Sequence, residues 1–121
     1  MKKLLLIMIG ALLMSACATE SSYHKISAEE AKQMMDSQEV IIVDVRTQEE
    51  YNAGHIENAI LIPNENISTE PNELDNKDAI ILVYCRSGSR SKAASDKLVN
   101  LGYKNIYDFG GIIDWPYEIV D

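Results

Sequence analysis

The sequence predicts an α/β fold whose sheet is mainly parallel and is covered by helices on both faces. Short runs such as Val40–Val45 and Ala79–Tyr84 are apolar at nearly every position, which is typical of strands buried on both faces. Segments with helix-capping signals separate these runs, and strands that alternate with helices favour a parallel sheet. About a hundred residues carry this pattern, which is enough for one domain with a modest core.

The first half of the domain contains two predicted strands, each followed by a helix. Residues 23–26 are expected to form a short edge strand, and residues 40–45, rich in β-branched side chains, a central strand. Each helix opens with a capping box, in which a Ser or Thr and a Glu three residues later bond to each other's backbone. The two pairs are Ser27 with Glu30, before an apolar face of Ala31, Met34 and Met35, and Thr47 with Glu50, before a short helix ending near Gly54.

The second half repeats the alternation. Residues 59–62 are predicted to form a strand that ends before Pro63. The polar, acidic segment 64–78 is predicted to be a loop with one helical turn near Leu74. A strand at 79–84 precedes a helix over 91–101, with Gly102 as its C-terminal cap. Residues 105–109 form the last strand, followed by Gly110-Gly111 and a tail that carries Trp115.

Cys85 lies between a predicted strand and a predicted helix, at the sheet edge where α/β proteins bind ligands. Unpaired N–H groups at a helix N-terminus stabilise negative charge, so this position favours the reactive thiolate over the thiol. The following residues can curl into a nest of N–H groups, with Gly88 supplying unusual dihedrals and Ser87 and Ser89 hydroxyl donors. The sequence therefore predicts sulfur or anion chemistry at Cys85.

The overall charge is acidic, with 11 basic and 19 acidic residues and a formal net charge of -8. Nucleic-acid binding is not expected, because proteins that bind nucleic acids usually carry a basic footprint. A local basic island surrounds the cysteine loop, which favours a small anion as ligand, although its lysines also fit a solvated helix face. Its members are Arg86, Arg90, Lys92, Lys97 and Lys104.

The N-terminus has the layout of an export signal. A basic start, Met1–Lys3, precedes an apolar stretch, Leu4–Met14, that is too short for a transmembrane helix of about 20 residues. Ser15-Ala16-Cys17 resembles a bacterial lipobox, in which Cys17 is lipidated and becomes the mature N-terminus; ordinary cleavage after Ala18 is the alternative. We therefore expect a lipoprotein signal peptide at 1–16, a tether at 17–22 and a domain at 23–121.

Both cleavage patterns export the protein from the bacterial cytoplasm, and lipidation would anchor it outside the cytoplasmic membrane or at the outer membrane. Removal of Lys2 and Lys3 makes the mature chain more acidic still. Cys17 is then acylated or removed, which leaves Cys85 as the one free thiol of the mature chain. An unpaired cysteine in an oxidising compartment is a candidate reactive group.

The loop Cys85–Ser91 resembles the active-site loop of rhodanese-like sulfurtransferases. Three further segments are similar to that family: Asp44-Val45-Arg46 with Glu50-Tyr51, Gly54-His55-Ile56 with Ala59, and Gly110-Gly111 with Trp115. The resemblance implies a three-layer fold with a five-stranded, mainly parallel sheet and helices on both faces. It also implies a sulfurtransferase of the thiosulfate:cyanide type that needs no cofactor.

In that family the cysteine takes sulfane sulfur from a donor such as thiosulfate, holds it as a persulfide and passes it to cyanide or a thiol. The resemblance thus makes Cys85 catalytic and assigns substrate binding to Arg86, Ser87, Gly88, Ser89 and Arg90. A carrier that exchanges sulfur with a partner protein without turnover remains an alternative, since it needs the same loop. A cysteine phosphatase is a further alternative, but such relatives have five residues between cysteine and arginine, and this loop has four.

Other polar residues are expected to support the fold. Arg86 either meets the donor anion or faces solvent, and Arg90 either binds the ligand or pairs with an acid. Asp44 and Arg46 are predicted to pair with each other or with neighbouring loops, and His55 to lie toward the opposite edge of the sheet from Cys85. Trp115 is expected to be packed core or lid. The two histidines, His24 and His55, are too far apart in sequence to suggest a metal site.

Overall fold

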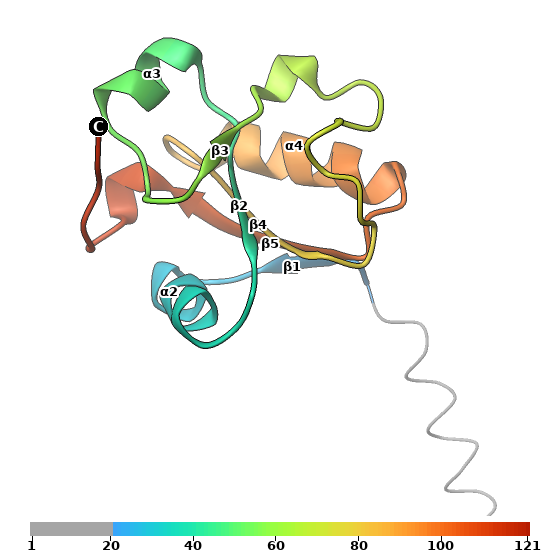
Figure 1. The fold of residues 1–121 in the computed structure, drawn as a ribbon, viewed down its shortest axis with the longest axis horizontal. Helices are drawn as coiled ribbons and strands as arrows, with labels where there is room; N and C mark the ends of the chain where they lie inside the picture. Colours follow the sequence, from blue (N-terminus) through green and yellow to red (C-terminus); the bar gives the residue numbers. More distant parts are fainter. Residues whose placement is uncertain (1–20) are drawn as a thin grey trace, which may run out of the picture.

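A computed structural model describes residues 21–121 as a five-stranded sheet flanked by helices (Figure 1). The strand order is β1-β5-β4-β2-β3, and every neighbouring pair runs parallel. The strands are β1 (Tyr23–Lys25), β2 (Ile41–Asp44), β3 (Ile60–Leu61), β4 (Ile80–Cys85) and β5 (Asn105–Gly111). The helices are α2 (Ala28–Ser37), α3 (Gln48–Ala53) and α4 (Ser89–Asn100), with short 3₁₀ turns η2 (Asn64–Asn66) and η3 (Ile112–Asp114). The predicted parallel α/β fold is confirmed.

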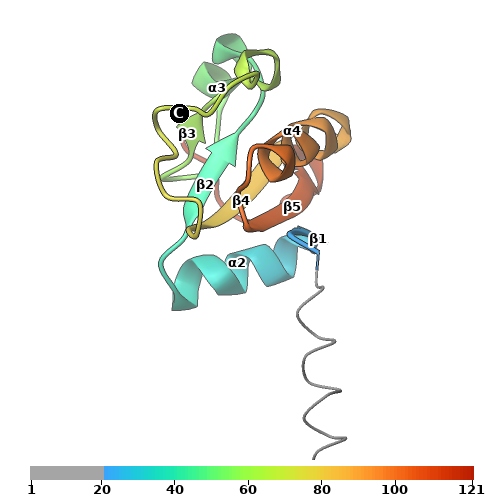
Figure 2. The same cartoon turned by 90° about the vertical axis from the view of Figure 1, so that its right-hand side faces the viewer.

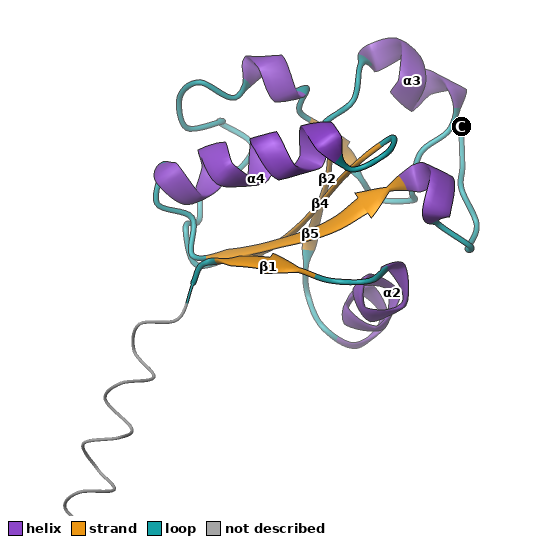
Figure 3. Cartoon of the chain, turned by 180° about the vertical axis from the view of Figure 1, so that it is seen from behind, coloured by secondary structure: helices purple, strands orange, loops and turns teal. Residues whose placement is uncertain are grey.

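Helices α4 and α2 lie on opposite faces of the sheet (Figures 2 and 3). Successive side chains of a strand point to opposite faces, so β4 contributes to two cores. Val83 and Cys85 pack with Ala94 and Leu98 of α4, while Leu82 and Tyr84 pack in the cluster that includes Ala31 of α2. This alternation places the Cys85 side chain on the face of the sheet that α4 covers.

Both predicted capping boxes are present. The Ser27 hydroxyl accepts from the Glu30 N–H at 3.0 Å, and the Glu30 carboxylate accepts from the Ser27 N–H at 3.0 Å. Thr47 and Glu50 exchange the equivalent bonds at the start of α3. Each box satisfies N–H groups that the first helical turn cannot pair internally.

Several boundaries differ from the expected ones by one or two residues. Helix α4 starts at Ser89 rather than residue 91, because Gly88, at φ 109°, forms its N-cap. Strand β5 continues through Gly111 instead of ending at 109, and β3 is reduced to two residues. Segment 64–78 contains the expected turn, in which the buried Leu74 donates to the Pro71 carbonyl, and also the unexpected turn η2.

The predicted signal peptide at 1–16 lies outside the described residues, as does Cys17. Of the predicted tether, Ser21 and Ser22 are described, and the Ser22 carbonyl accepts from the Ile106 N–H at 3.0 Å. Pairing with the sheet therefore begins one residue before the expected domain start. No helix within residues 21–121 is both long and apolar enough to cross a membrane.

Candidate active site

Cys85 is the last residue of β4 and is buried, with 1% of its surface exposed. The Gly88 N–H donates to its Sγ over 3.0 Å. The left-handed conformation of Gly88 lets the chain turn from β4 into α4 within three residues, so this N–H faces back toward the sulfur. A negative sulfur at this place would face both a donated hydrogen bond and the positive end of α4.

The end of β5 forms a wall along the cysteine loop. The register of β4 and β5 shifts between Val83 and Cys85, so that Cys85 stands opposite Gly111. A Cβ at Gly111 would lie 2.1 Å from the Arg86 carbonyl oxygen, and that oxygen also accepts from the Ile113 N–H at 3.2 Å. Only glycine permits this approach, which explains the glycine at position 111, the last residue of β5.

Arg90 uses both terminal nitrogens to bind Glu50. Its Nη1 and Nη2 donate to the two Glu50 carboxylate oxygens over 2.8 and 3.0 Å. This hydrogen bonding lowers the pKa of Glu50 to about 2 and raises that of Arg90, and negative charge on Cys85 raises the Arg90 pKa further. Of the two roles open to Arg90, the structure shows the pairing with an acid.

Asp44 and Arg46 form the predicted pair, and both are buried. Arg46 donates from Nε to Oδ1 at 2.9 Å and from Nη2 to Oδ2 at 2.7 Å. The Tyr84 hydroxyl, one residue before Cys85, adds a 2.6 Å bond to Asp44 Oδ2. Burial opposes the charge of Arg46, but the bonds to Asp44 outweigh it and raise its pKa. The pair thus ties β2 to the end of β4.

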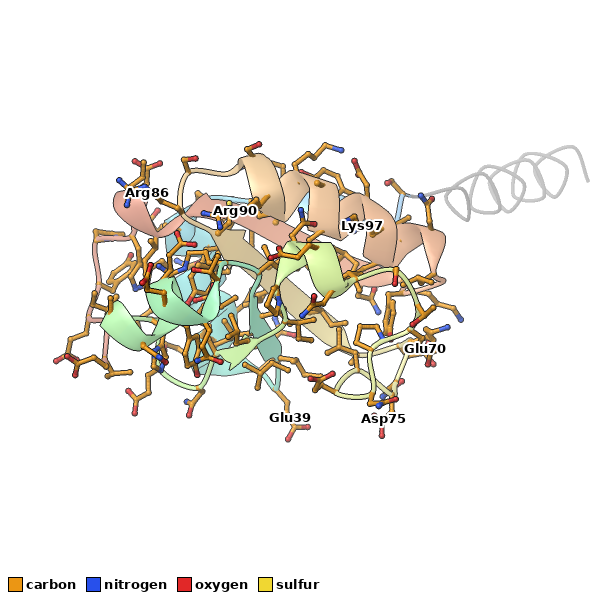
Figure 4. All side chains as sticks on the ribbon, turned by 90° about the horizontal axis from the view of Figure 1, so that it is seen from above. Glu39, Glu70, Asp75, Arg86, Arg90 and Lys97 are labelled. Carbon is orange, nitrogen blue, oxygen red and sulfur yellow. The ribbon has the colours of Figure 1, made fainter. Side chains whose placement is uncertain are left out.

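The basic island is largely engaged in contacts. Beside Arg90, Lys92 pairs with Asp96 at 2.7 Å, Lys104 with Asp78 at 3.3 Å, and Lys97 donates to the carbonyl and side chain of Asn64. Arg86 is exposed and makes no ion pair within residues 21–121. Figure 4 shows Arg86, Arg90 and Lys97 in order from the loop along α4. The net attraction for an anion at the loop is therefore smaller than five cations suggest.

A hollow of about 460 Å³ adjoins the loop on the β1 side. Its lining includes Ser87, Gly88, Gly110 and Gly111, together with Lys25 at the end of β1. Lys25 was not among the residues that the sequence singled out, because it lies sixty positions from Cys85 and only the β1–β5 pairing brings it near. With Arg86, it gives the loop two basic neighbours.

The sequence predicted that His55 lies toward the edge of the sheet opposite Cys85. This prediction is wrong. The neighbours of His55 contact the carboxyl ends of the strands: Gly54 accepts from Arg46 at 2.8 Å, and Ile56 donates to the Tyr84 hydroxyl at 3.1 Å. The His55 ring stacks on Tyr51 with centroids 3.7 Å apart, and Nδ1 lies 2.9 Å from the Tyr51 carbonyl oxygen. These contacts give His55 a packing role beside the site.

Asp108 is a further residue that sequence reasoning missed. It is 1% exposed on β5 and accepts bonds from Tyr23, Ser91 and the Gly110 N–H. An Asp among the apolar residues Ile106, Tyr107 and Phe109 was the available signal. Trp115 is packed against Phe109 with ring centroids 5.5 Å apart, as expected of a core or lid residue.

Within the described part of the chain, no three His, Cys, Asp or Glu side chains are placed to hold a metal ion. A cysteine sulfur, the Gly88 N–H donated to it and the exposed Arg86 beside it suit nucleophilic attack followed by storage of a small transferred group. The fold and loop together define an α/β protein with a buried cysteine at a strand–helix turn.

Residues 27–116 match the family model described as the rhodanese-like domain, and the chain belongs to this family. Among solved structures, it resembles a rhodanese-related protein from Thermoplasma volcanium with a TM-score of 0.70 and 31% identity, over 81% of this chain and 98% of that one. A rhodanese-like domain protein from Staphylococcus aureus gives 0.67 and 37%, over 78% and 93%. An E. coli rhodanese solved with anions gives 0.63 and 28%, over 69% and 99%.

Curated relatives include proteins named tRNA uridine(34) hydroxylase. Those of Photorhabdus laumondii and Yersinia pestis are 38% and 36% identical, over 74% and 76% of this chain but only 27% and 28% of their own length. The chain thus spans about a quarter of these relatives. Family membership supports sulfur transfer as the general kind of activity.

Proposed function

We propose that this chain is an exported sulfurtransferase that carries sulfane sulfur on Cys85. The observation that carries the proposal is the Cys85 sulfur, buried at the start of α4 with the Gly88 N–H 3.0 Å away. The same donors that stabilise a thiolate can stabilise a persulfide anion after sulfur transfer.

Transfer from thiosulfate proceeds in two displacements without net oxidation. The Cys85 thiolate attacks the outer sulfur, a new S–S bond forms, the original S–S bond breaks, and sulfite leaves with its electron pair. Cyanide or a thiolate then attacks the terminal sulfur of the persulfide, and Cys85 departs as a thiolate. Covalent storage divides one difficult transfer into two steps and predicts ping-pong kinetics.

Arg86 is the loop cation that remains to attract the donor, because Arg90 is held by Glu50. Arg86→Ala should raise the KM for thiosulfate by about tenfold, the loss of roughly one charge-assisted hydrogen bond. Thermal unfolding should not change, since the side chain is exposed. An unchanged KM would remove Arg86 from substrate binding.

Intact mass spectrometry under non-reducing conditions tests the sulfur proposal directly. Incubation with thiosulfate should add one sulfur atom to the wild type and none to Cys85→Ala. A cyanide assay then separates enzyme from carrier: turnover supports the enzyme, and persulfide formation without turnover supports a carrier that passes sulfur to a partner protein. No gain of sulfur, or Cys85-dependent hydrolysis of an aryl phosphate instead, would overturn the assignment.

We do not expect this chain to act on tRNA as the names of its longer relatives describe. The match covers about a quarter of those proteins, and the chain is strongly acidic. Four of the five residues of the basic island are already bound within the domain, which leaves little of the basic footprint that RNA requires.

We further propose that Cys17 carries a lipid anchor and that the domain works outside the cytoplasm. The motif Ser15-Ala16-Cys17 after an apolar stretch supports this proposal. Mass analysis of the membrane fraction from the producing bacterium should show acylated Cys17 as the first residue. In Cys17→Ser the domain should leave the membrane fraction. Cleavage after Ala18, with no acyl group, would contradict lipidation but not export.

A further inference from the structure

Asp108 is a buried carboxylate whose partners are all neutral. Its Oδ1 accepts from the Ser91 hydroxyl at 2.8 Å and from the Gly110 N–H at 3.0 Å, and its Oδ2 accepts from the Tyr23 hydroxyl at 2.7 Å. No arginine or lysine pairs with it within residues 21–121. Burying a charge without an opposite charge costs stability, so an apolar side chain would serve packing alone better.

The two groups bound at Oδ1 lie on opposite sides of the cysteine loop. Ser91, in the first turn of α4, also lies 3.0 Å from the Gly88 carbonyl, and Gly88 is the residue whose N–H bonds to Cys85. Gly110 is held at φ 84° and leads into Gly111, which touches the Arg86 carbonyl. One carboxylate oxygen therefore joins both walls of the loop.

We propose that Asp108 is a positioning residue that sets the loop around Cys85 through Ser91 and Gly110. Through Ser91, whose Oγ lies 3.0 Å from the Gly88 carbonyl oxygen, it fixes the start of α4 and with it residue Gly88, whose N–H donates to the sulfur. Through Gly110 it fixes the wall against which the Arg86 peptide rests. For the persulfide step this inference rests on the proposed function, but the placing of the Cys85 sulfur is independent of it.

The third partner of Asp108 supplies a matched control. Tyr23 belongs to β1 and binds only Oδ2, away from the two loop contacts. Tyr23→Phe should therefore lower stability while it leaves the loop in place. Ser91→Ala removes the link to α4 without altering any charge, and Asp108→Ala removes both links.

Asp108→Asn separates hydrogen bonding from charge. Its amide oxygen can accept from Ser91 and Gly110 in place of Oδ1, and its amide nitrogen can donate to the Tyr23 oxygen. This variant should behave as the wild type at the loop if the hydrogen bonds position it. It also controls for the electrostatic effect of removing a negative charge near the thiolate.

The experiment measures the rate of Cys85 alkylation by iodoacetamide, which needs no sulfur donor, beside persulfide formation from thiosulfate and thermal unfolding. Both rates are expressed per folded molecule. Asp108→Ala and Ser91→Ala should lower both rates by about tenfold, as expected when a reacting group is misplaced by a fraction of an ångström. Tyr23→Phe and Asp108→Asn should stay within about twofold of the wild type.

If Cys85 in Ser91→Ala is alkylated at the wild-type rate, the inference is overturned. This test can be made even if Asp108→Ala does not fold. Loss of reactivity in Tyr23→Phe in proportion to its lost stability would also overturn it, because Asp108 would then act on stability alone. If persulfide is absent from every variant and from the wild type while alkylation follows the expected order, the sulfur proposal fails and the positioning role stands.

Discussion

Glu50 and Arg90, forty residues apart, join the N-terminus of α3 to the first turn of α4. Glu50 Oε1 accepts from the N–H and hydroxyl of Thr47 and from Arg90 Nη1, so one carboxylate closes a capping box and binds the cysteine loop. The segment after β2 is thereby coupled to the segment after β4. This coupling restrains Arg90 at a position where the sequence alone left its role open.

Glu50→Gln should weaken this coupling but keep the helix cap, because the amide oxygen still accepts from Thr47. The side chains of Arg90 and Glu50 are 34% and 26% exposed, so we expect a loss on the order of 1 kcal/mol in the free energy of unfolding. Urea denaturation measures it. Lys92→Ala, which removes the exposed pair with Asp96, should cost less than about 0.5 kcal/mol. Equal losses in the two variants would show that the Glu50–Arg90 contact contributes no more to the free energy of unfolding than an exposed ion pair does.

The same carboxylate should make stability depend on pH. Hydrogen bonds from Arg90 lower the pKa of folded Glu50 to about 2, against 4.5 for the free group. The folded state therefore binds this proton less readily than the unfolded chain, and the stabilisation is complete above pH 4.5 and is lost as pH falls toward 2. Urea midpoints of the wild type and Glu50→Gln should converge over that interval. A difference independent of pH would contradict this reading.

Asp44→Ala should be far more damaging. Arg46 and the Tyr84 hydroxyl would each lose a buried partner, and removing one member of a buried ion pair costs about 3–5 kcal/mol. That is a large part of the roughly 5–15 kcal/mol that holds a typical domain folded. Urea denaturation again measures the effect, with Lys32→Ala as control for an exposed pair with Asp36. A loss below about 1 kcal/mol would mean that Arg46 finds another acceptor.

Local patterns predicted most of the elements but few of the contacts between them. The capping boxes at Ser27 and Thr47 and the place of Cys85 after β4 follow from residues near in sequence. The Glu50–Arg90 pair and the Asp108 contacts depend on which strands become neighbours, which no local pattern encodes. The expected position of His55 failed because the segment before β3 is held by long-range contacts near the ends of β2 and β4, from Gly54 to Arg46 and from Ile56 to Tyr84.

Ser95 offers a stabilising change. It is fully buried in α4, and its hydroxyl has no hydrogen-bond partner among the described residues. Ser95→Ala removes this unsatisfied group and improves helix propensity, so we expect a gain of about 1 kcal/mol. That gain corresponds to a rise of about 4–8 °C in Tm for a domain of this size. A fall in Tm would reveal a bond that the hydroxyl makes in solution.

Gly111→Ala should abolish the reactivity of Cys85. Gly111 has φ -118°, which any residue adopts, so the effect is steric: the new methyl group would lie 2.1 Å from the Arg86 carbonyl oxygen and 2.6 Å from Ser87 Cα. Both atoms are backbone, so the cysteine loop itself must move, and a displacement near the reacting group can cost about a hundredfold in rate.

Gly102→Ala is the control, because Gly102 lies in the left-handed region at φ 102° but meets only the flexible end of Lys77, at 3.4 Å. It should cost about 1 kcal/mol in stability and leave Cys85 alkylation and persulfide formation unchanged. Gly111→Ala with wild-type rates per folded molecule would show that the loop tolerates a displaced Arg86 peptide.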